Sequence, residues 1–242
     1  MISFFVKKFL NFFDYFQKKK IIKKLKIIQG NKEFQTVFDV GAHKGETIDF
    51  FLKHLEIKNI YSFEPSEESF KSLLNKAEVL KKKFINVSIF LENSAVGSVD
   101  KNIKLNLLNE TSSSTLQNLN LNSKYFKKKE KYFGKLINKK IEVKQVNFKN
   151  YLEIKNIDRI DLLKIDTEGY EFEVLKGLDS SISKVYIILF EHHYDDMIIK
   201  NYTFQNIHKF LVNNGFKKVY KIKMPFRKSF DYIYIKNTVK TN

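Results

Sequence analysis

The chain has 242 residues, of which 43% are hydrophobic, so it can bury one substantial core and form one domain with additions. It has no cysteine, which excludes disulfide frameworks and thiolate zinc sites and permits a reducing compartment. The formal net charge is +17, but only Arg159 and Arg227 are arginine, the usual residue for recognising phosphate or bases. We therefore expect no dedicated nucleic-acid partner.

Residues 1–30 are predicted to form a basic amphipathic helical extension. Apolar residues recur at three- and four-residue steps and so share one face, and a lysine-rich stretch follows at residues 18–26. Two contacts through residues 1–26 remain open: packing on the domain or on a second copy, and a peripheral contact with anionic lipid headgroups. The apolar face comprises Ile2, Phe5, Val6, Phe9, Phe12, Phe13 and Phe16.

The sequence lacks the signals of membrane insertion or export. No window reaches the roughly 18 uninterrupted apolar residues of a membrane-spanning helix. Lys7 and Lys8 interrupt the first apolar run, and no small-residue cleavage site follows it. We expect a cytoplasmic protein, with a peripheral position at the inner membrane face as the alternative that the helix allows.

From residue 31 to residue 242, short apolar runs alternate with helical patterns, as in βαβ units around a parallel sheet. Ser66 is predicted to cap a helix, and Gly177 to end one. These residues therefore indicate one α/β domain. Strands are predicted at 36–40, 59–63, 86–91, 160–165 and 185–190, helices at 47–55, 66–82, 170–176 and 204–212, and an antiparallel pair at 217–222 and 232–235.

Residues 100–150 interrupt this alternation. Two segments, 103–107 and 141–146, have the pattern of strands, and between them lie a hydroxyl-rich stretch at 111–115 and a lysine-rich stretch at 124–135. Long connections of this kind are often functional. We interpret the region as an insertion or lid, with a solvated surface loop as the alternative.

The first predicted strand ends in a glycine loop, DVGAHKG at residues 39–45. A parallel sheet binds its ligand beyond the carboxyl ends of its strands, and glycines let the backbone approach that ligand. The loop lacks the G-x-G-x-x-G pattern of dinucleotide sites, which favours a ligand without phosphate, such as S-adenosylmethionine. The candidate cofactor residues of this loop are Asp39, Gly41, Ala42, His43 and Gly45.

Two further groups of polar residues follow the next two strands. Glu64 ends the second strand, where a carboxylate can accept hydrogen bonds from both ribose hydroxyls, and Pro65 then stops the strand. Glu92, Asn93 and Ser94 follow the third strand, where a polar side chain can reach an adenine amino group. The alternative is that the carboxylates of this region, Asp39 included, only cap local backbone amides.

Four segments in this order resemble the FkbM family of methyltransferases: DVGAHKG at 39–45, FEP at 63–65, AVG at 95–97 and DLLKIDTEGYE at 161–171. The resemblance spans roughly residues 36–192. It implies a class I, Rossmann-like α/β fold, with a seven-stranded, mostly parallel sheet and helices on both faces. It also implies S-adenosylmethionine as donor and a hydroxyl of a sugar, glycan precursor or other small molecule as acceptor.

Methyl transfer from a sulfonium is an in-line displacement, so the protein must align the reactants and receive the acceptor's proton. Asp166 ends the fourth strand and is favoured as the residue near the methyl group, where it also meets the cofactor. Glu168 follows it and either assists or supports the loop. His192, after the fifth strand, is the preferred histidine for a general base. The proton acceptor stays open between Asp166, Glu168 and His192.

Three other interpretations are weighed against this one. Asp166, Glu168, Glu191 and a histidine would also suit Mg²⁺ or Mn²⁺, but their spacing demands no metal, and we predict none. An RNA methyltransferase is suggested by the net charge alone. A membrane-associated binding module on a Rossmann scaffold is suggested by the N-terminal helix, because a fold does not establish an activity.

Overall fold

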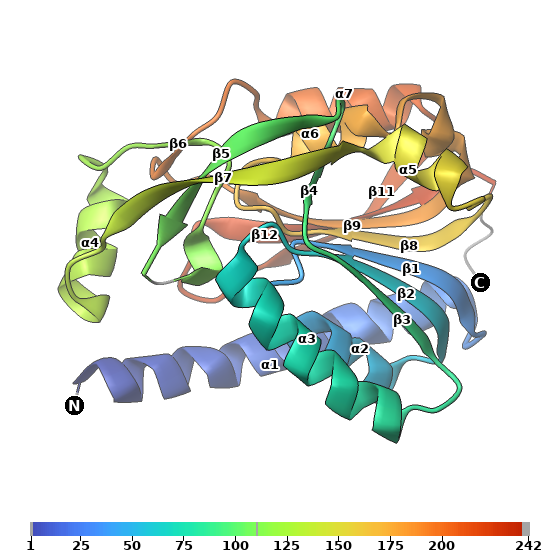
Figure 1. The fold of residues 1–242 in the computed structure, drawn as a ribbon, viewed down its shortest axis with the longest axis horizontal. Helices are drawn as coiled ribbons and strands as arrows, with labels where there is room; N and C mark the ends of the chain where they lie inside the picture. Colours follow the sequence, from blue (N-terminus) through green and yellow to red (C-terminus); the bar gives the residue numbers. More distant parts are fainter. Residues whose placement is uncertain (1, 110, 239–242) are drawn as a thin grey trace.

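The computed structural model describes residues 2–109 and 111–238, with the side chains at 2–11, 111 and 133 outside the description. At its centre lies a seven-stranded sheet in the order β11-β12-β9-β8-β1-β2-β3 (Figure 1). In this sheet β12 runs antiparallel to both neighbours and the other strands share one direction. The strands are β1 (Phe34–Val40), β2 (Ile57–Phe63), β3 (Ser88–Glu92), β8 (Ile160–Ile165), β9 (Val185–His193), β11 (Phe216–Lys223) and β12 (Ser229–Lys236).

The central strands β1, β2 and β8 are largely buried, and apolar residues make up most of each strand, because helices cover both faces of the sheet. Every residue of β8 is buried. β1 pairs with β2 on one side and with β8 on the other, so the strand order reverses at β1. An open parallel sheet binds ligands at such a point. The glycine loop after β1 therefore lies where a ligand is expected.

Helices cover both faces of the sheet, as predicted (Figure 1). On one face, α1 (Ile2–Gln29), α2 (Glu46–His54) and α3 (Glu67–Lys83) pack through an apolar cluster that includes Leu25, Ile48 and Leu73. On the other face, a second cluster includes Leu152, Val174 and Leu211. These three come from α5 (Phe148–Ile154), α6 (Glu171–Gly177) and α7 (Phe204–Asn213), respectively.

One predicted helix cap is confirmed and one is wrong. The Ser66 side chain accepts a hydrogen bond from the N–H of Ser69 at the start of α3. Gly177 is the last residue of α6 but not its cap, because the C-cap is Leu178 and a short 3-10 helix, η2 (Asp179–Lys184), follows it. A Cβ at Gly177 would lie 2.2 Å from the carbonyl oxygen of Gly97. This glycine is therefore needed for the close approach of α6 to β4 (Ala95–Gly97).

Two segments of region 100–150 form a second, smaller sheet with a strand that precedes the region, in the order β4-β7-β5. It contains both predicted strands, as β5 (Lys101–Leu108) and β7 (Asn138–Asn147), together with β4, which was not predicted. Figure 1 shows this sheet on the α5–α7 side of the central sheet, with α4 (Lys124–Phe133) beyond its end. The remaining short elements are η1 (Thr111–Ser113) and the strand pair β6 (Asn118–Leu119) and β10 (Ile198–Ile199).

The N-terminal extension is a single helix whose two halves differ. Its second half packs on the domain through Ile21, Ile22, Leu25 and Ile28, which are buried. In the predicted aromatic face, Phe12 and Phe16 are exposed, while Ile2, Phe5, Val6 and Phe9 lie outside the described side chains. None of the helices in the described part of the chain has the length and hydropathy of a membrane span.

Candidate functional site

A cavity of about 390 Å³ lies at the carboxyl ends of β1, β2, β8 and β9, within the usual size range of small-molecule sites. The loop after β1, the middle of α1 and residues 112–116 contribute to its walls. Of the predicted site residues, Gly41, Ala42, His43, Glu64, Pro65, Ser94, Asp166 and Glu168 line the cavity, whereas Asp39, Gly45, Glu92, Asn93 and His192 are not among its lining residues.

Gly41 brings the glycine loop at residues 39–45 into contact with the segment at residues 161–171. Its φ angle is +84°, and a Cβ there would lie 1.9 Å from the carbonyl oxygen of Asp166. The N–H of Asp166 donates to the carbonyl oxygen of Val40 at 2.9 Å. Only glycine accommodates both the backbone angle and the contact. The glycine loop and the end of β8 therefore form one continuous wall.

Glu64 ties this loop to the end of β2. Its carboxylate accepts hydrogen bonds from the N–H groups of His43 and Ser66, at 2.9 and 2.8 Å. Burial raises the pKa of Glu64, although these bonds oppose the shift. Glu64 thus caps local backbone amides, as the alternative holds, but it also lines the cavity. Because each carboxylate oxygen has a second lone pair, Glu64 retains acceptor capacity at the cavity wall.

Asp39 acts on the loop through a lysine instead of lining the cavity. It is fully buried, and its Oδ1 lies 2.9 Å from Nζ of Lys164. Lys164 also donates to the carbonyl oxygen of Gly41 at 3.0 Å and lies 3.5 Å from Asp166. Burial alone would lower the pKa of Lys164, but the charges of Asp39 and Asp166 outweigh it and raise that pKa. Lys164 is therefore a buried cation that fixes Gly41.

Asp166 is the ionised carboxylate of the site. Burial would raise its pKa, but the charge of Lys164 outweighs burial and lowers that pKa. Its side chain is about one-third exposed at the cavity wall. A negative charge is thus held beside whatever ligand the cavity takes.

Gly45 serves helix packing. It precedes α2 with a φ angle of +84°, and a Cβ there would lie 3.0 Å from the Leu73 side chain of α3. The glycine therefore allows the start of α2 to pack closely against α3. Its predicted contact with a ligand is not what the geometry favours.

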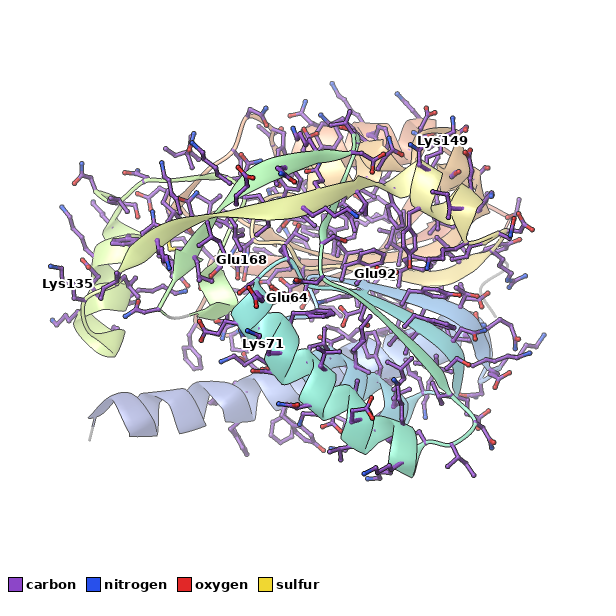
Figure 2. The ribbon with its side chains drawn as sticks, viewed as in Figure 1. Glu64, Lys71, Glu92, Lys135, Lys149 and Glu168 are labelled. Carbon is purple, nitrogen blue, oxygen red and sulfur yellow. The ribbon has the colours of Figure 1, made fainter. Side chains whose placement is uncertain are left out.

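The polar residues after β3 also differ in whether they reach the cavity. The Tyr151 hydroxyl donates to Glu92 at 2.9 Å, and the Asn93 amide donates to the carbonyl oxygen of Glu64 at 2.8 Å. Figure 2 shows Glu92 displaced from Glu64 towards α5. These contacts explain why neither Glu92 nor Asn93 reaches the cavity. Ser94 does line it, and its buried hydroxyl oxygen has no hydrogen-bond partner among the described residues.

His192 faces away from the cavity, which contradicts its predicted role as general base. β9 continues to His193 because it pairs with β12, and side chains alternate along a strand, so His192 and Glu191 face opposite sides. The ring of His192 packs 4.9 Å from Tyr194 and 6.0 Å from Tyr202, between centroids. Burial lowers the pKa of His192 to about 3, so it is a neutral core residue.

The neighbouring His193 lies among carboxylates. Its Nε2 is 3.3 Å from Glu168 and 3.4 Å from Glu191, and its Nδ1 is 3.5 Å from Asp195. Burial would lower the pKa of His193, but the charges of Glu168 and Glu191 outweigh it and raise the pKa to about 10. His193 is therefore an imidazolium that holds the Glu168 carboxyl. Within the described residues, no group of three or more acidic or histidine side chains has the arrangement of a metal site.

Glu168 has the properties of a proton acceptor. Burial raises its pKa to about 7, while His193 opposes the shift. A general base is most effective when its pKa lies near the working pH. Glu168 also has a φ angle of +50°, and its carbonyl oxygen accepts a hydrogen bond from the Thr115 hydroxyl at 2.5 Å. Region 100–150 thus supports this backbone conformation directly.

The cavity is acidic although the protein is basic. Among the lining residues, Asp and Glu outnumber Lys and Arg by seven to three. Figure 2 shows Glu64 and Glu168, two of these carboxylates, at the centre of the molecule. An excess of carboxylates favours a cationic ligand, because their negative charge offsets the cost of moving the ligand's positive charge out of water.

The family assignment agrees with this geometry. The methyltransferase FkbM domain matches residues 39–218. This chain belongs to the FkbM methyltransferase family. The match begins at Asp39 and includes the loop after β1, β8 and the whole of β9, which are the elements that build the cavity.

Solved structures share the fold of this member of the FkbM family at low sequence identity. The FkbM methyltransferase of Methylobacillus flagellatus KT aligns with a TM-score of 0.56 and 12% identity, over 84% of this chain and 44% of that chain. The magnesium protoporphyrin IX methyltransferase of Synechocystis PCC 6803, solved with bound SAM, aligns with a TM-score of 0.54 and 10% identity, over 96% and 84%. The chain thus spans less than half the length of the first structure. No curated protein sequence matches it.

Several residues of the FkbM site were not predicted. Lys164 and Asp231 are charged residues that each stand between two apolar or aromatic residues of a strand, and that pattern is the signal that sequence reasoning missed. From α1, Gln17 donates to Asp231, and Asp14 pairs with Arg227 at 2.8 Å. Nothing in the amphipathic pattern of α1 identifies its polar residues as part of a site. Their role depends on how the helix lies across the sheet.

Proposed function

We propose that the chain transfers a methyl group from S-adenosylmethionine to a hydroxyl of a sugar, a glycan precursor or another small molecule. Methyl transfer follows from the family, whereas the donor site and the acceptor are inferred from the cavity. The observation that carries the proposal is the pair of carboxyls after β8. Asp166 is held ionised, and Glu168 has a pKa of about 7, in one acid-rich cavity.

The residues of the cavity suit this donor. S-adenosylmethionine carries a sulfonium and an ammonium group and supplies an electrophilic methyl group when bound. The ionised Asp166 would stabilise that positive charge. Glu64 offers unused lone pairs to ribose hydroxyls, and the Ser94 hydroxyl, buried without a partner, would be satisfied by a polar group of the ligand.

The acceptor is inferred from residues 112–116, which also contribute to the cavity wall. Ser112 and Ser114 of region 100–150 line the cavity near Glu168, which supports a hydroxyl-bearing acceptor. Glu168 would receive the hydroxyl proton as the oxygen attacks the methyl group. His193 would keep the Glu168 carboxyl ionised and fixed in position.

The charge distribution disfavours RNA as the acceptor. The net charge of +17 is spread over the chain, while the cavity itself is rich in carboxylates. Phosphates at the cavity would therefore meet charge of their own sign. A binding module without activity is disfavoured by Glu168, because a pKa near 7 at a cavity wall is a property that catalysis uses.

The test is methyl transfer to hydroxyl-bearing acceptors, followed by mass spectrometry of the products. Wild type is compared with Glu168→Gln and with Glu92→Gln, the same change at a carboxylate that contacts Tyr151 outside the cavity. We expect methylated product with wild type and Glu92→Gln, and a loss of about 100-fold or more with Glu168→Gln. Equal activity of the two variants would exclude Glu168 as the proton acceptor.

A further inference from the structure

Four exposed aromatic side chains form what we call the aromatic patch. Phe12 is 58% exposed, Tyr15 48%, Phe16 50% and Phe226 63%, the last from the loop between β11 and β12. Ring contacts connect them: Phe12 lies 4.8 Å from Phe16, and Phe13 lies 5.5 Å from Phe12 and 5.1 Å from Phe226, between centroids. Single exposed apolar residues are common on protein surfaces, but a contiguous cluster marks an interaction site.

Lysines surround the aromatic patch. Nζ of Lys19 lies 5.5 Å from the centre of the Tyr15 ring, and Lys20 is exposed one residue further along α1. Lys223 and Lys228, both exposed, flank the loop that carries Phe226. The one carboxylate in the α1 sequence, Asp14, is paired with Arg227. The surface therefore combines aromatic rings with uncompensated positive charge.

We infer that the aromatic patch docks on an anionic lipid surface. Rings of this kind enter the boundary between headgroups and acyl chains, while lysines beside them meet anionic headgroups. A second copy of the chain fits less well, because two copies that each carry a net charge of +17 would bring their lysines together. The opposite charge of the lipid turns the same lysines into a contribution to binding.

The elements that carry the aromatic patch also build the cavity. Gln17 and Lys18 of α1 line the cavity on the turn that follows Phe12 and Phe16, and Met224 and Arg227 line it beside Phe226. Lipid docking would therefore bring the cavity wall to the membrane surface, within reach of a lipid-linked acceptor. That consequence rests on the proposed function, whereas lipid binding itself does not.

The first experiment is cosedimentation with vesicles of equal parts phosphatidylcholine and phosphatidylglycerol. The patch variant carries Phe12→Ser and Phe16→Ser, and the control carries Ile85→Ser and Ile154→Ser, two exposed apolar residues elsewhere. Both variants keep the full charge. We expect the patch variant to bind about tenfold more weakly than wild type, and the control to bind as wild type does.

A tryptophan reporter locates the contact. The chain has no tryptophan, so Phe16→Trp introduces a single fluorophore at the aromatic patch and Ile85→Trp introduces one at the control position. Anionic vesicles should shift the emission of the first to shorter wavelength and leave the second unchanged. Pure phosphatidylcholine vesicles should give a smaller shift, because the lysines then lack anionic headgroups.

Three outcomes would overturn the inference. The first is that wild type does not bind anionic vesicles. The second is equal binding by wild type and the patch variant, which would show that net charge alone attracts the protein. The third is a dimer of wild type, found by light scattering, that is lost in the patch variant while neither binds lipid. The affinity for S-adenosylmethionine, measured in the same samples, tests the proposed function separately.

Discussion

Lys164 and Asp39 form a buried ion pair, 2.9 Å between Nζ and Oδ1, that joins two of the sequence motifs of the family. Lys164 stands in β8 and Asp39 in the neighbouring β1. The same lysine holds the carbonyl oxygen of Gly41 and lies beside Asp166. One cation thus sets the shape of the glycine loop and the charge of the carboxylate that faces the cavity.

Lys164→Met should lower the free energy of unfolding by about 3–5 kcal/mol, because it leaves Asp39 buried without a partner. Urea unfolding measures the change. The matched control is Lys53→Met, which removes an exposed pair with Asp49 and should cost less than about 1 kcal/mol. The double variant Asp39→Asn with Lys164→Met should recover much of the loss. If Lys164→Met lowered the free energy of unfolding no more than Lys53→Met does, the buried ion pair would not be what stabilises the glycine loop.

Gly41→Ala should lower stability by about 3 kcal/mol or more and abolish donor binding, because the new Cβ would collide with the carbonyl oxygen of Asp166. Gly215→Ala is the control, since Gly215 has a φ angle of +80° and open space around its Cβ position. That variant should cost only about 1 kcal/mol. Unfolding curves and calorimetry with S-adenosylmethionine give both quantities. Equal losses of stability in Gly41→Ala and Gly215→Ala would show that the collision with Asp166 does not destabilise the protein.

The rate should depend on pH through Glu168. A base works in its ionised form, so kcat/KM should rise as the pH passes through about 7, the pKa of Glu168, and then level off. Rates measured from pH 5 to pH 9, at roughly unit steps, would show this rise as the acidic limb of the pH–rate profile. In Glu168→Gln, any residual rate should lack it. A limb near pH 7 that survives in that variant would assign the titration to another group.

His193→Gln should move this limb to higher pH. The substitution removes a positive charge beside Glu168, and losing that charge raises the pKa of the carboxyl, by about one unit for each 1.4 kcal/mol of lost interaction. His192→Gln is the matched control, because that ring packs against Tyr202 away from the cavity. It should leave the position of the limb unchanged. A shift with His192→Gln in place of His193→Gln would reverse the assignment of the two histidines.

The sequence predicts the sheet well where burial dictates residue type. Residues 160–165 are predicted with their observed bounds because β8 is buried at every position. The end of β9 was placed too early, since Glu191, His192 and His193 are polar and only their pairing with β12 extends the strand. Because the predicted strand ended at residue 190, the sequence pattern did not indicate that the side chains of His192 and His193 face opposite sides of the sheet. Strand bounds that depend on a distant partner are not encoded locally.

The sequence likewise predicts only part of the candidate site. The motifs identify the loop, Glu64, Asp166 and Glu168, because those residues follow strands whose order can be inferred. They do not show which side chains the ligand can reach. Asp39 and Glu92 are carboxylates at strand ends in the sequence, yet each is used by a neighbour in space, Lys164 or Tyr151. Such partners come from segments far along the chain, so only the tertiary structure reveals them.

The most direct test of the account compares the affinities for S-adenosylmethionine and S-adenosylhomocysteine by calorimetry. The two ligands differ by the methyl group and the positive charge on sulfur. If Asp166 holds that charge, Asp166→Asn should weaken binding of S-adenosylmethionine about tenfold and that of S-adenosylhomocysteine much less. Asp158→Asn, at an exposed carboxylate, should change neither affinity. Failure of wild type to bind either ligand, or an unchanged affinity of Asp166→Asn for S-adenosylmethionine, would contradict the account.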